Sequence, residues 1–205
     1  MFRGIAELVA LFCLVVPVNQ VSAQSWKKLT VDVDSNLRGI SAARIPATNH
    51  IAIWASGSHG VILRSLDEGS SWTRLAVSGH PELDFRGIVA ISDTTAYLMS
   101  SGEGVKSRIY KTTTGGANWE LQYTDTNKSF FLDSIACLSE KSCFALGDPI
   151  DGKFLILQTA DGLHWKPWIA HVAVGAARAA LGPEAALEAV VFDALRRCNS
   201  IRAAG

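Results

Sequence analysis

Short apolar runs alternate with polar, glycine-rich stretches along most of this chain. Three runs share one pattern, "LRGISA" at residues 37–42, "FRGIVA" at 85–90 and "LDSIAC" at 132–137, and they lie 48 and 47 residues apart. Their length and their Ile, Val and Ala content are typical of β-strands, and the Gly, Ser and Asp residues between them are typical of turns. The hydrophobic pattern therefore predicts strands that return at a fixed period.

Each of these runs opens a longer unit. A second apolar run follows ("HIAIWASGSHG", "TAYLMSSGEG", "CFALGDPIDG"), then a third ("VILRS", "SRIYKT", "FLILQT"), then a turn and a tryptophan that opens a fourth strand. The tryptophans, spaced by 46, 47 and 46 residues, are Trp26, Trp72, Trp119 and Trp165. A four-stranded unit cannot bury both its faces alone, so the repeat predicts units stacked around an axis.

The predicted fold class is all-β: a partial β-propeller of about three four-stranded blades, about 47 residues each, over residues 24–169. A β-helix is the alternative architecture, but its repeats are usually shorter. Propellers normally close with more blades than three repeats supply. We therefore expect further strands in a full-length protein, and we expect three blades alone to be poorly stable because two sheet faces stay bare.

The turn before the second tryptophan of the series reads "SLDEGSSW". Ser65 and Asp67 can bond the backbone of the turn, and Gly69 can adopt the positive φ that a tight loop needs. Trp72 then packs its ring into the blade. All of these roles are structural, so the motif alone does not predict catalysis.

The turn recurs twice with substitutions. The second copy, "TTTGGANW", has Thr114 where Asp is expected, and the third, "TADGLHW", is one residue shorter. We expect looser second and third turns in the same fold. The positions corresponding to the first copy are Thr112, Gly116 and Trp119 in the second, and Thr159, Asp161 and Trp165 in the third.

These turns resemble the Asp-box, or BNR repeat, of a propeller superfamily that includes sialidases, xyloglucanases and sortilin-type receptors. The "RGI" of the first strand, the "GxxG" before the third and the "GG..W" turn narrow the resemblance to the photosystem II stability/assembly factor family and its bacterial WD40/YVTN/BNR-like relatives. The resemblance covers residues 25–168. It implies a non-catalytic binding or scaffold protein with a protein partner on one propeller face.

The N-terminal 23 residues have the pattern of a secretory signal peptide. Arg3 provides the positive charge, residues 5–18 form an apolar run, and Val21 and Ala23 satisfy the small-residue rule for cleavage after Ala23. This predicts a secreted or periplasmic protein with no stable membrane span after cleavage. The alternative is an N-terminal membrane anchor, although the run is short for one.

Charge and cysteine usage add two expectations. Lys plus Arg and Asp plus Glu number 19 each, so no net field favours nucleic acid or an anionic membrane. Cys137 and Cys143 flank a polar turn, where an oxidising compartment would allow a disulfide across the hairpin; two buried thiols are the alternative. Cys198 has no evident partner.

The composition changes after Trp168. From residue 170 to 205, 12 of 36 residues are Ala, and Lys is absent after Lys166. "GPEAALEAVVFDALRRC" is patterned as an amphipathic helix, with Pro183 in its first turn. We hypothesise that residues 170–205 are a frameshift product, which the other reading frames past codon 169 can test. A genuine helical C-terminal segment is the alternative.

An enzyme of the sialidase type is the competing function. The Arg-Ile-Pro of "ARIP" resembles a motif near the start of sialidases, which makes Arg44 a weak catalytic candidate in a turn just after the first strand. The further arginines and the Tyr–Glu pair that such enzymes need would lie largely in absent blades. The histidines have no ligand spacing and no calcium or phosphate loop is complete, so we expect no metal or cofactor.

Arg38 and Arg86 are the binding candidates. They occupy equivalent positions in the first strands of successive units, and Asp133 occupies that position in the third. Guanidinium groups repeated along a propeller can form an anion or peptide-carboxylate site, and the family resemblance implies an arginine patch. The alternative is that each Arg pairs with an acidic neighbour between blades. A protein partner is expected and a carbohydrate is the alternative.

Overall fold

The structure is a computed structural model that describes residues 28–29, 31–45, 48 and 50–168 of the 205-residue chain. Contacts between Cα atoms divide the chain into Met1–Thr30 and Val31–Gly205, and every sheet belongs to the second unit. The predicted signal peptide at 1–23, Trp26 and the predicted helical tail at 170–205 lie outside the described residues.

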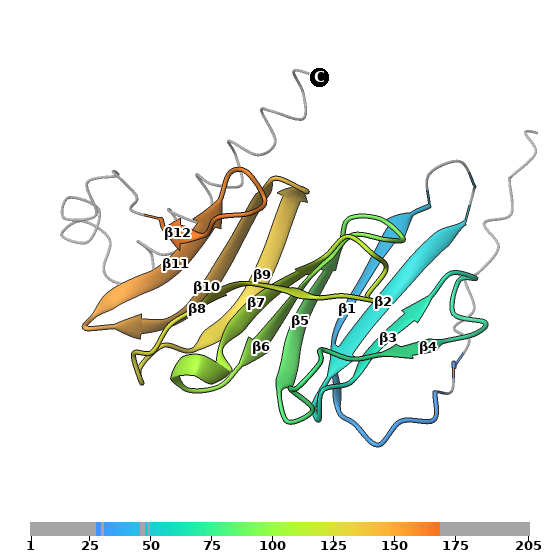
Figure 1. Ribbon diagram of the computed structural model, residues 1–205, viewed down its shortest axis with the longest axis horizontal. Coiled ribbons are helices and arrows are strands. Elements are labelled where there is room, and N and C mark those ends of the chain that lie inside the picture. Colours follow the sequence, from blue (N-terminus) through green and yellow to red (C-terminus); the bar gives the residue numbers. More distant parts are fainter. Residues whose placement is uncertain (1–27, 30, 46–47, 49, 169–205) are drawn as a thin grey trace, which may run out of the picture. The chain divides into compact units, whose positions relative to one another are not determined.

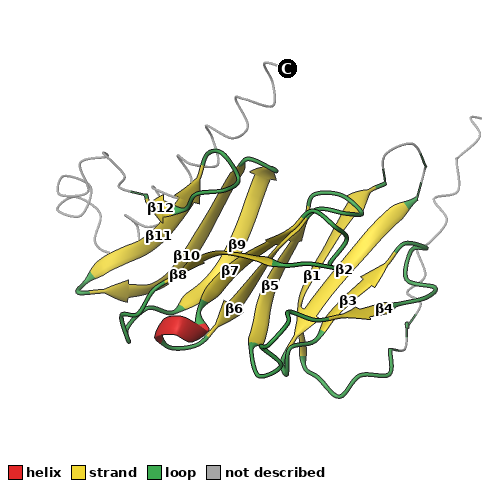
Figure 2. Cartoon of the chain, viewed as in Figure 1, coloured by secondary structure: helices red, strands yellow, loops and turns green. Residues whose placement is uncertain are grey.

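The described residues form three four-stranded antiparallel sheets with one short 3-10 turn, η1 (Gly104–Lys106) (Figures 1 and 2). This confirms the predicted all-β fold of partial propeller type. The first sheet contains β1 (Leu37–Arg44), β2 (Ile51–Gly57), β3 (Ile62–Ser65) and β4 (Thr73–Leu75). The second contains β5 (Asp84–Ala90), β6 (Ala96–Ser101), β7 (Arg108–Thr112) and β8 (Glu120–Thr124). The third contains β9 (Leu132–Ser139), β10 (Ser142–Ile150), β11 (Lys153–Thr159) and β12 (Lys166–Pro167).

Within each sheet the strands pair in chain order, so each sheet is a meander. The first strands of neighbouring sheets contact each other, β1 with β5 and β5 with β9. The fourth strands β4, β8 and β12 lie at the opposite edges. The repeat predicted four-stranded units stacked around an axis, and the contacts between successive first strands fit that arrangement.

Two boundaries differ from the prediction. Each turn tryptophan precedes the fourth strand by one residue and does not open it. Arg44 was expected in a turn but is the last residue of β1, because its backbone pairs with Ile51 of β2. The interpretation of "ARIPATNH" as a turn from its first residue was therefore wrong.

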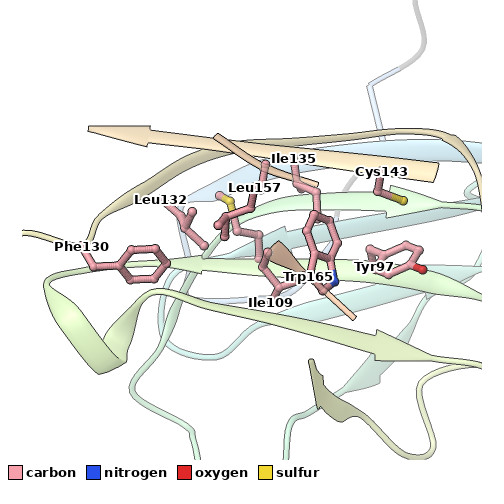
Figure 3. Packing of buried hydrophobic residues seen from close by; sticks show 10 residues of the cluster. Tyr97, Ile109, Phe130, Leu132, Ile135, Cys143, Leu157 and Trp165 are labelled. Atoms are coloured by element: carbon pink, nitrogen blue, oxygen red, sulfur yellow. The ribbon is translucent and has the colours of Figure 1, made fainter. Parts of the chain in front are cut away.

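Two of the three hydrophobic clusters in the described residues lie between successive sheets, and the third is a small one around Ala55, Val61 and Leu63. The cluster between the second and third sheets is shown in Figure 3 and includes Tyr97, Ile109, Phe130, Leu132, Leu157 and Trp165, each at most 7% exposed. The cluster between the first and second sheets is built around Trp54, Phe85, Ile88, Leu98 and Tyr110. The strand β6 is buried at every position because the second sheet is covered on both faces. This explains why its sequence shows an apolar run without alternation.

Cys137 and Cys143 face each other across the β9–β10 pair. The structure joins them in a disulfide with an S–S distance of 2.09 Å. Cys143 is fully buried and packs in the core between the second and third sheets. The disulfide therefore links the two innermost strands of the third sheet.

Candidate functional site

The turn between β3 and β4 is closed by the side chains of Ser65 and Asp67. The Ser65 hydroxyl donates to Asp67 Oδ1 at 2.7 Å and accepts the N–H of Gly69 at 2.7 Å. Asp67 Oδ1 accepts the N–H of Ser71 at 2.8 Å, and its Oδ2 accepts the Ser71 hydroxyl at 2.6 Å. The Trp72 indole N–H donates to the Gly69 carbonyl at 3.1 Å. These bonds satisfy backbone groups that have no strand partner.

The second turn forms equivalent bonds without a carboxylate. Thr112 Oγ1 accepts the N–H of Gly116 at 3.0 Å, as Ser65 does for Gly69. Thr114 Oγ1 accepts the N–H of Asn118 at 3.0 Å, which is the role of Asp67 in the first turn. The hydroxyl of Thr114 thus replaces the missing Asp.

The third turn is shorter but keeps the same framework. Thr159 Oγ1 accepts the N–H of Gly162 at 2.9 Å. Asp161 Oδ1 accepts the N–H groups of both Leu163 and His164 at 2.8 Å. Side-chain oxygens bond the backbone in all three turns, and the looser second and third turns stay a prediction.

The glycine at the centre of each turn is required by its backbone conformation. Gly69, Gly116 and Gly162 have φ values of 89°, 84° and 76°. Only glycine adopts this region without cost. A Cβ on Gly162 would also lie 2.5 Å from the backbone oxygen of Glu140. Close packing of this turn on the neighbouring hairpin therefore adds a second constraint.

The hydrogen bonds of the turn keep two carboxyl groups ionised. The hydroxyl and then the N–H of Ser71, together with the Ser65 hydroxyl, lower the pKa of Asp67 to about 2. The N–H and the ring of His164 hold the pKa of Asp161 far below its ordinary range. Both groups are exposed, so the effect arises from hydrogen bonding to the charged form and not from burial.

These shifts predict acid sensitivity of the first and third turns. A carboxyl group whose pKa is lower in the folded state stabilises the fold above its unfolded pKa of about 4. For Asp67 that contribution is lost as the pH falls from about 4 through the folded pKa of about 2. The double variant Asp67→Asn/Asp161→Asn should therefore be less stable than the parent at pH 6.

Urea unfolding followed by circular dichroism at pH 6, 4 and 2.5 measures this difference in stability. The difference between the parent and the double variant should shrink as the pH falls. Asp93→Asn is the control, since Asp93 is engaged through its backbone carbonyl and its carboxylate makes no hydrogen bond within the described residues. A difference that stays constant from pH 6 to 2.5 would rule out the carboxylate contribution.

An aromatic residue paired with a cation connects the first sheet to the second. Arg64 lies over the Trp54 ring at 5.4 Å, and its Nη1 donates to the Asp93 carbonyl of the β5–β6 hairpin at 3.2 Å. The Trp54 indole N–H donates to the Ser92 carbonyl of the same hairpin at 3.1 Å. Trp119, from the second turn, packs edge-on against Trp54 at 6.2 Å.

The second sheet makes the same connection to the third. Lys111 Nζ lies over the Tyr97 ring at 5.3 Å, contacts Glu140 Oε1 at 3.1 Å and donates to the Gly162 carbonyl at 3.2 Å. The Tyr97 hydroxyl donates to the carbonyl of Glu140 at 2.7 Å. Burial alone would lower the pKa of Lys111, but Glu140 raises it above its ordinary value. Trp165 packs edge-on against Tyr97 at 6.0 Å.

Sequence reasoning missed these two aromatic–cation pairs. In each pair the two residues face each other in the backbone register of equivalent neighbouring strands, Trp54 with Arg64 on β2 and β3, and Tyr97 with Lys111 on β6 and β7. The signal was present in the aligned repeats, where the cation directly precedes the first residue of the turn in "ILRS" and "RIYKT". In the third unit Gln158 occupies that position, and it pairs with Phe144.

Arg38 and Arg86 each form an ion pair with the next sheet. Arg38 Nε lies 2.9 Å from Asp84 Oδ1 on β5, and Arg86 Nη1 lies 3.1 Å from Asp133 Oδ1 on β9. The two arginine side chains remain 42% and 43% exposed. The structure thus shows the pairing between blades that the sequence left as the alternative, and it leaves both guanidinium groups accessible.

The turns and these arginines lie at opposite ends of the sheets. Arg38 and Arg86 are near the start of β1 and β5, whereas the turns follow the end of β3, β7 and β11. In an antiparallel meander the first and third strands run in the same direction, so the start of the first strand and the end of the third lie at opposite ends of the sheet. The structural turns and the candidate binding residues are therefore on different faces.

Arg44 is not part of an arginine cluster. It lies six residues beyond Arg38 on β1, at the end of the sheet where the turns lie. Six residues of strand span about 20 Å. Arg44 therefore cannot act together with Arg38 or Arg86 on one small carboxylate.

Tyr97 and Glu140 form a tyrosine–glutamate pair, but not a nucleophilic one. Tyr97 is fully buried, and its hydroxyl donates to the carbonyl oxygens of Glu140 and Gly162. Burial raises the pKa of Tyr97, which disfavours the phenolate. The Tyr97 hydroxyl therefore joins the second sheet to the third by hydrogen bonds.

In the described ranges, no group of three or more His, Cys, Asp and Glu side chains is placed to hold a metal ion. Within the part of the chain that the structure describes, no helix is long and apolar enough to cross a membrane.

Comparison with known proteins identifies the family. The sequence profile of the family described as "Photosynthesis system II assembly factor YCF48" matches residues 19–136, which is more than half of the chain. The curated "Photosystem II assembly lipoprotein Ycf48" of Synechococcus sp. (strain CC9902) is 34% identical over 76 residues, covering 35% of this chain and 20% of that protein.

Two solved structures share the fold. "YCF48 bound to D1 peptide" superposes with a TM-score of 0.56 at 17% identity, over 72% of this chain and 45% of that one. "YCF48 from Cyanidioschyzon merolae" superposes with a TM-score of 0.54 at 18% identity, over 70% of this chain and 43% of that one. This chain thus spans a fifth of the curated relative and less than half of each solved chain. Because the family's sequence profile matches more than half of the chain, the chain belongs to the photosynthesis system II assembly factor YCF48 family.

Proposed function

We propose that this chain is a non-catalytic propeller module that binds a protein partner through the surface around Arg38 and Arg86. Its membership of the YCF48 family supports binding over catalysis. The observation that carries the choice of partner is the solved relative with a bound D1 peptide, since it shares the fold of this chain. A peptide segment of a partner protein is the ligand that we assign to this surface.

The two arginines keep the donors that such a ligand needs. A guanidinium group has five N–H donors. Only Nε of Arg38 and Nη1 of Arg86 are engaged by Asp84 and Asp133. The remaining N–H groups of both side chains can donate to a peptide carboxylate, side-chain or C-terminal, without breaking either ion pair.

The charges around the arginines define the peptide further. Burial and then the neighbouring Asp148 raise the pKa of Asp133, so carboxylates gather at the third sheet. Arg38 and Arg86 are thus each paired with one aspartate, and a second carboxylate, Asp148 on β10, lies beside Asp133. We propose that the bound segment places a carboxylate near the arginines and a basic or neutral group near the two aspartates.

We also propose that the protein acts outside the cytoplasm, as a scaffold for its partner. The N-terminal signal pattern supports export, and the curated relative carries the name of a lipoprotein. The balance of 19 basic and 19 acidic residues supports neither nucleic acid nor an anionic membrane as the partner.

Titration of the full chain with a fluorescent D1 peptide, followed by anisotropy, tests the proposed binding. We expect saturable binding that weakens at least tenfold in Arg38→Glu/Arg86→Glu, because a repulsive charge replaces an attractive one. Arg74→Glu is the matched control, since Arg74 is exposed on the edge strand β4. Equal loss in both variants would exclude a role for Arg38 and Arg86.

A second assay separates binding from catalysis. Incubation of the chain with a fluorogenic sialoside should release no fluorophore. Turnover that Arg44→Ala abolishes would overturn the non-catalytic assignment in favour of a glycoside hydrolase of the sialidase type.

A further inference from the structure

The third sheet has an apolar outer face, turned away from the second sheet, that the described residues leave uncovered. The strand registers align three of its residues with three of the second sheet: Phe144 with Tyr97, Leu146 with Met99, and Ile156 with Ile109. The residues of the second sheet are fully buried in the core between the second and third sheets. Leu146 is 48% exposed, and Phe144 and Ile156 are half-buried. The third sheet thus carries one side of an interface whose other side is missing from the described residues.

The first sheet carries the matching side on β1. The strand registers align Leu37 with Phe85 and Leu132, and Ile40 with Ile88 and Ile135. The residues on β5 and β9 are at most 9% exposed, because they pack in the cores against the preceding sheets. Leu37 is 48% exposed and Ile40 is 75% exposed, since no sheet precedes β1 in the described ranges. The counterpart of the outer face of the third sheet therefore lies on the same chain.

The charges at the start of the first strands are complementary in the same sense. A bulge in each first strand contains Arg38 on β1, Arg86 on β5 and Asp133 on β9. Arg38 and Arg86 each reach an aspartate at the start of the first strand of the next sheet. Asp133 has a second carboxylate, Asp148, beside it, and Arg86 is the one arginine that the described residues place there. A further sheet with an arginine at the start of its first strand would balance these two carboxylates, and β1 has that arginine.

Two copies of the chain supply enough sheets for a closed propeller. Each copy has three sheets, so two copies have six, and propellers close with about four to eight. A contact between the third sheet of one copy and the first sheet of another is head-to-tail, so it either closes into a ring or continues as a filament. Because each copy carries one face of each kind, a two-fold pair covers all of these faces.

We propose that two copies of this chain form a closed pair of six sheets, in which the outer face of the third sheet of each copy packs on β1 of the other. Leu37 and Ile40 then enter the same kind of core that their equivalents form inside one copy. Arg38 of each copy lies beside Asp133 of the other. Burial of the apolar side chains drives the pairing, and the charges favour the head-to-tail orientation. The pairing needs no bound peptide.

Size-exclusion chromatography with light scattering on the full chain tests the proposal. At micromolar concentration the parent should have twice the mass of one chain. Leu146→Glu places a charge in the contact, so it should weaken the pairing at least tenfold and give the mass of one chain. Leu163→Glu is the matched control and should pair as the parent does, because Leu163 is 53% exposed in the third turn, which contacts the second sheet.

The mass of the parent can contradict the proposal in two ways. A parent with the mass of one chain at every concentration would overturn it, and residues 169–205 would become the next occupant of the outer face to test. Assemblies larger than two copies would also overturn it, because the head-to-tail contact would then continue without closing.

Mixing two variants tests the head-to-tail geometry. Ile40→Lys alone and Leu146→Glu alone should each give single chains. Their equimolar mixture should pair, because one contact keeps both native residues and the other brings opposite charges together. Circular dichroism verifies the fold of each variant, and a mixture of folded variants that stays as single chains would overturn the proposal.

The two positions suit this test because both side chains are exposed in a single copy. Neither substitution therefore removes a buried contact within the copy that carries it. Ile40→Ala should likewise weaken the pairing and leave the stability of a single copy nearly unchanged, when unfolding is measured at a concentration at which the copies are separate.

Discussion

Trp54→Ala should lower the free energy of unfolding by about 3–5 kcal/mol, the range for a large aromatic removed from a core. Trp54 is fully buried between the first and second sheets and packs edge-on against Trp119. Its indole N–H bonds the Ser92 carbonyl, and Arg64 lies over its ring. The substitution therefore leaves a cavity, an unpaired carbonyl and an uncovered cation at one contact between sheets.

Urea unfolding followed by far-ultraviolet circular dichroism measures this loss without relying on tryptophan fluorescence. Ile40→Ala is the matched control, because Ile40 is 75% exposed on β1 of the same sheet. Its effect should stay below about 1 kcal/mol. Equal losses in the two variants would mean that Trp54 does not hold the first and second sheets together.

Gly147→Ala should destabilise the third sheet by about 3 kcal/mol, at the upper end for overpacking. A Cβ on Gly147 would overlap the backbone oxygen of Phe131 and lie 2.9 Å from the Leu155 side chain. The Phe131 oxygen accepts the N–H of Asp148 at 3.0 Å, so it cannot move without loss of that bond. The strand pairing of β9 with β10 must shift instead.

Gly152→Ala separates lack of space from backbone conformation. Gly152 has a φ of 73° with nothing within 4 Å of a Cβ, so its substitution costs only the conformational strain of about 1 kcal/mol. Urea unfolding should rank Gly147→Ala as clearly more damaging. The reverse order would contradict the packing of Phe131 against Gly147.

Local chemistry made the repeat predictable from the sequence. A turn such as "SLDEGSSW" bonds mostly within its own residues, so Ser65, Asp67 and Gly69 can be recognised without knowledge of their neighbours. The strands followed because their apolar runs are bounded by such turns. Even the error at Arg44 was local, since pairing with Ile51 extended β1 over a residue that precedes a turn-like segment.

Most contacts between sheets were not revealed by the sequence. The partners of Lys111 are Glu140 and Gly162, and they come from the next unit. The pairing of Arg38 and Arg86 with acidic neighbours between blades was only an alternative until the structure showed it. Only an alignment of the units, column by column, would have pointed to the aromatic–cation pairs.

The candidate sites illustrate the same limit. Arg38 and Arg86 were found because they repeat. The pairing of the fourth strands could not be read from the repeat, because a bulge between β7 and β8 pairs Tyr123 with Ile109, whereas Leu75 pairs with the equivalent Ile62 in the first sheet.

The central claim is that the surface around Arg38 and Arg86 binds a peptide of a partner protein. The most direct measurement is chemical-shift mapping of the unlabelled D1 peptide on the ¹⁵N-labelled full chain. The account predicts saturable shifts that concentrate at the starts of β1, β5 and β9, around Arg38, Arg86 and Asp133. Shifts that avoid these strand ends, or no saturable shift at millimolar peptide, would contradict it.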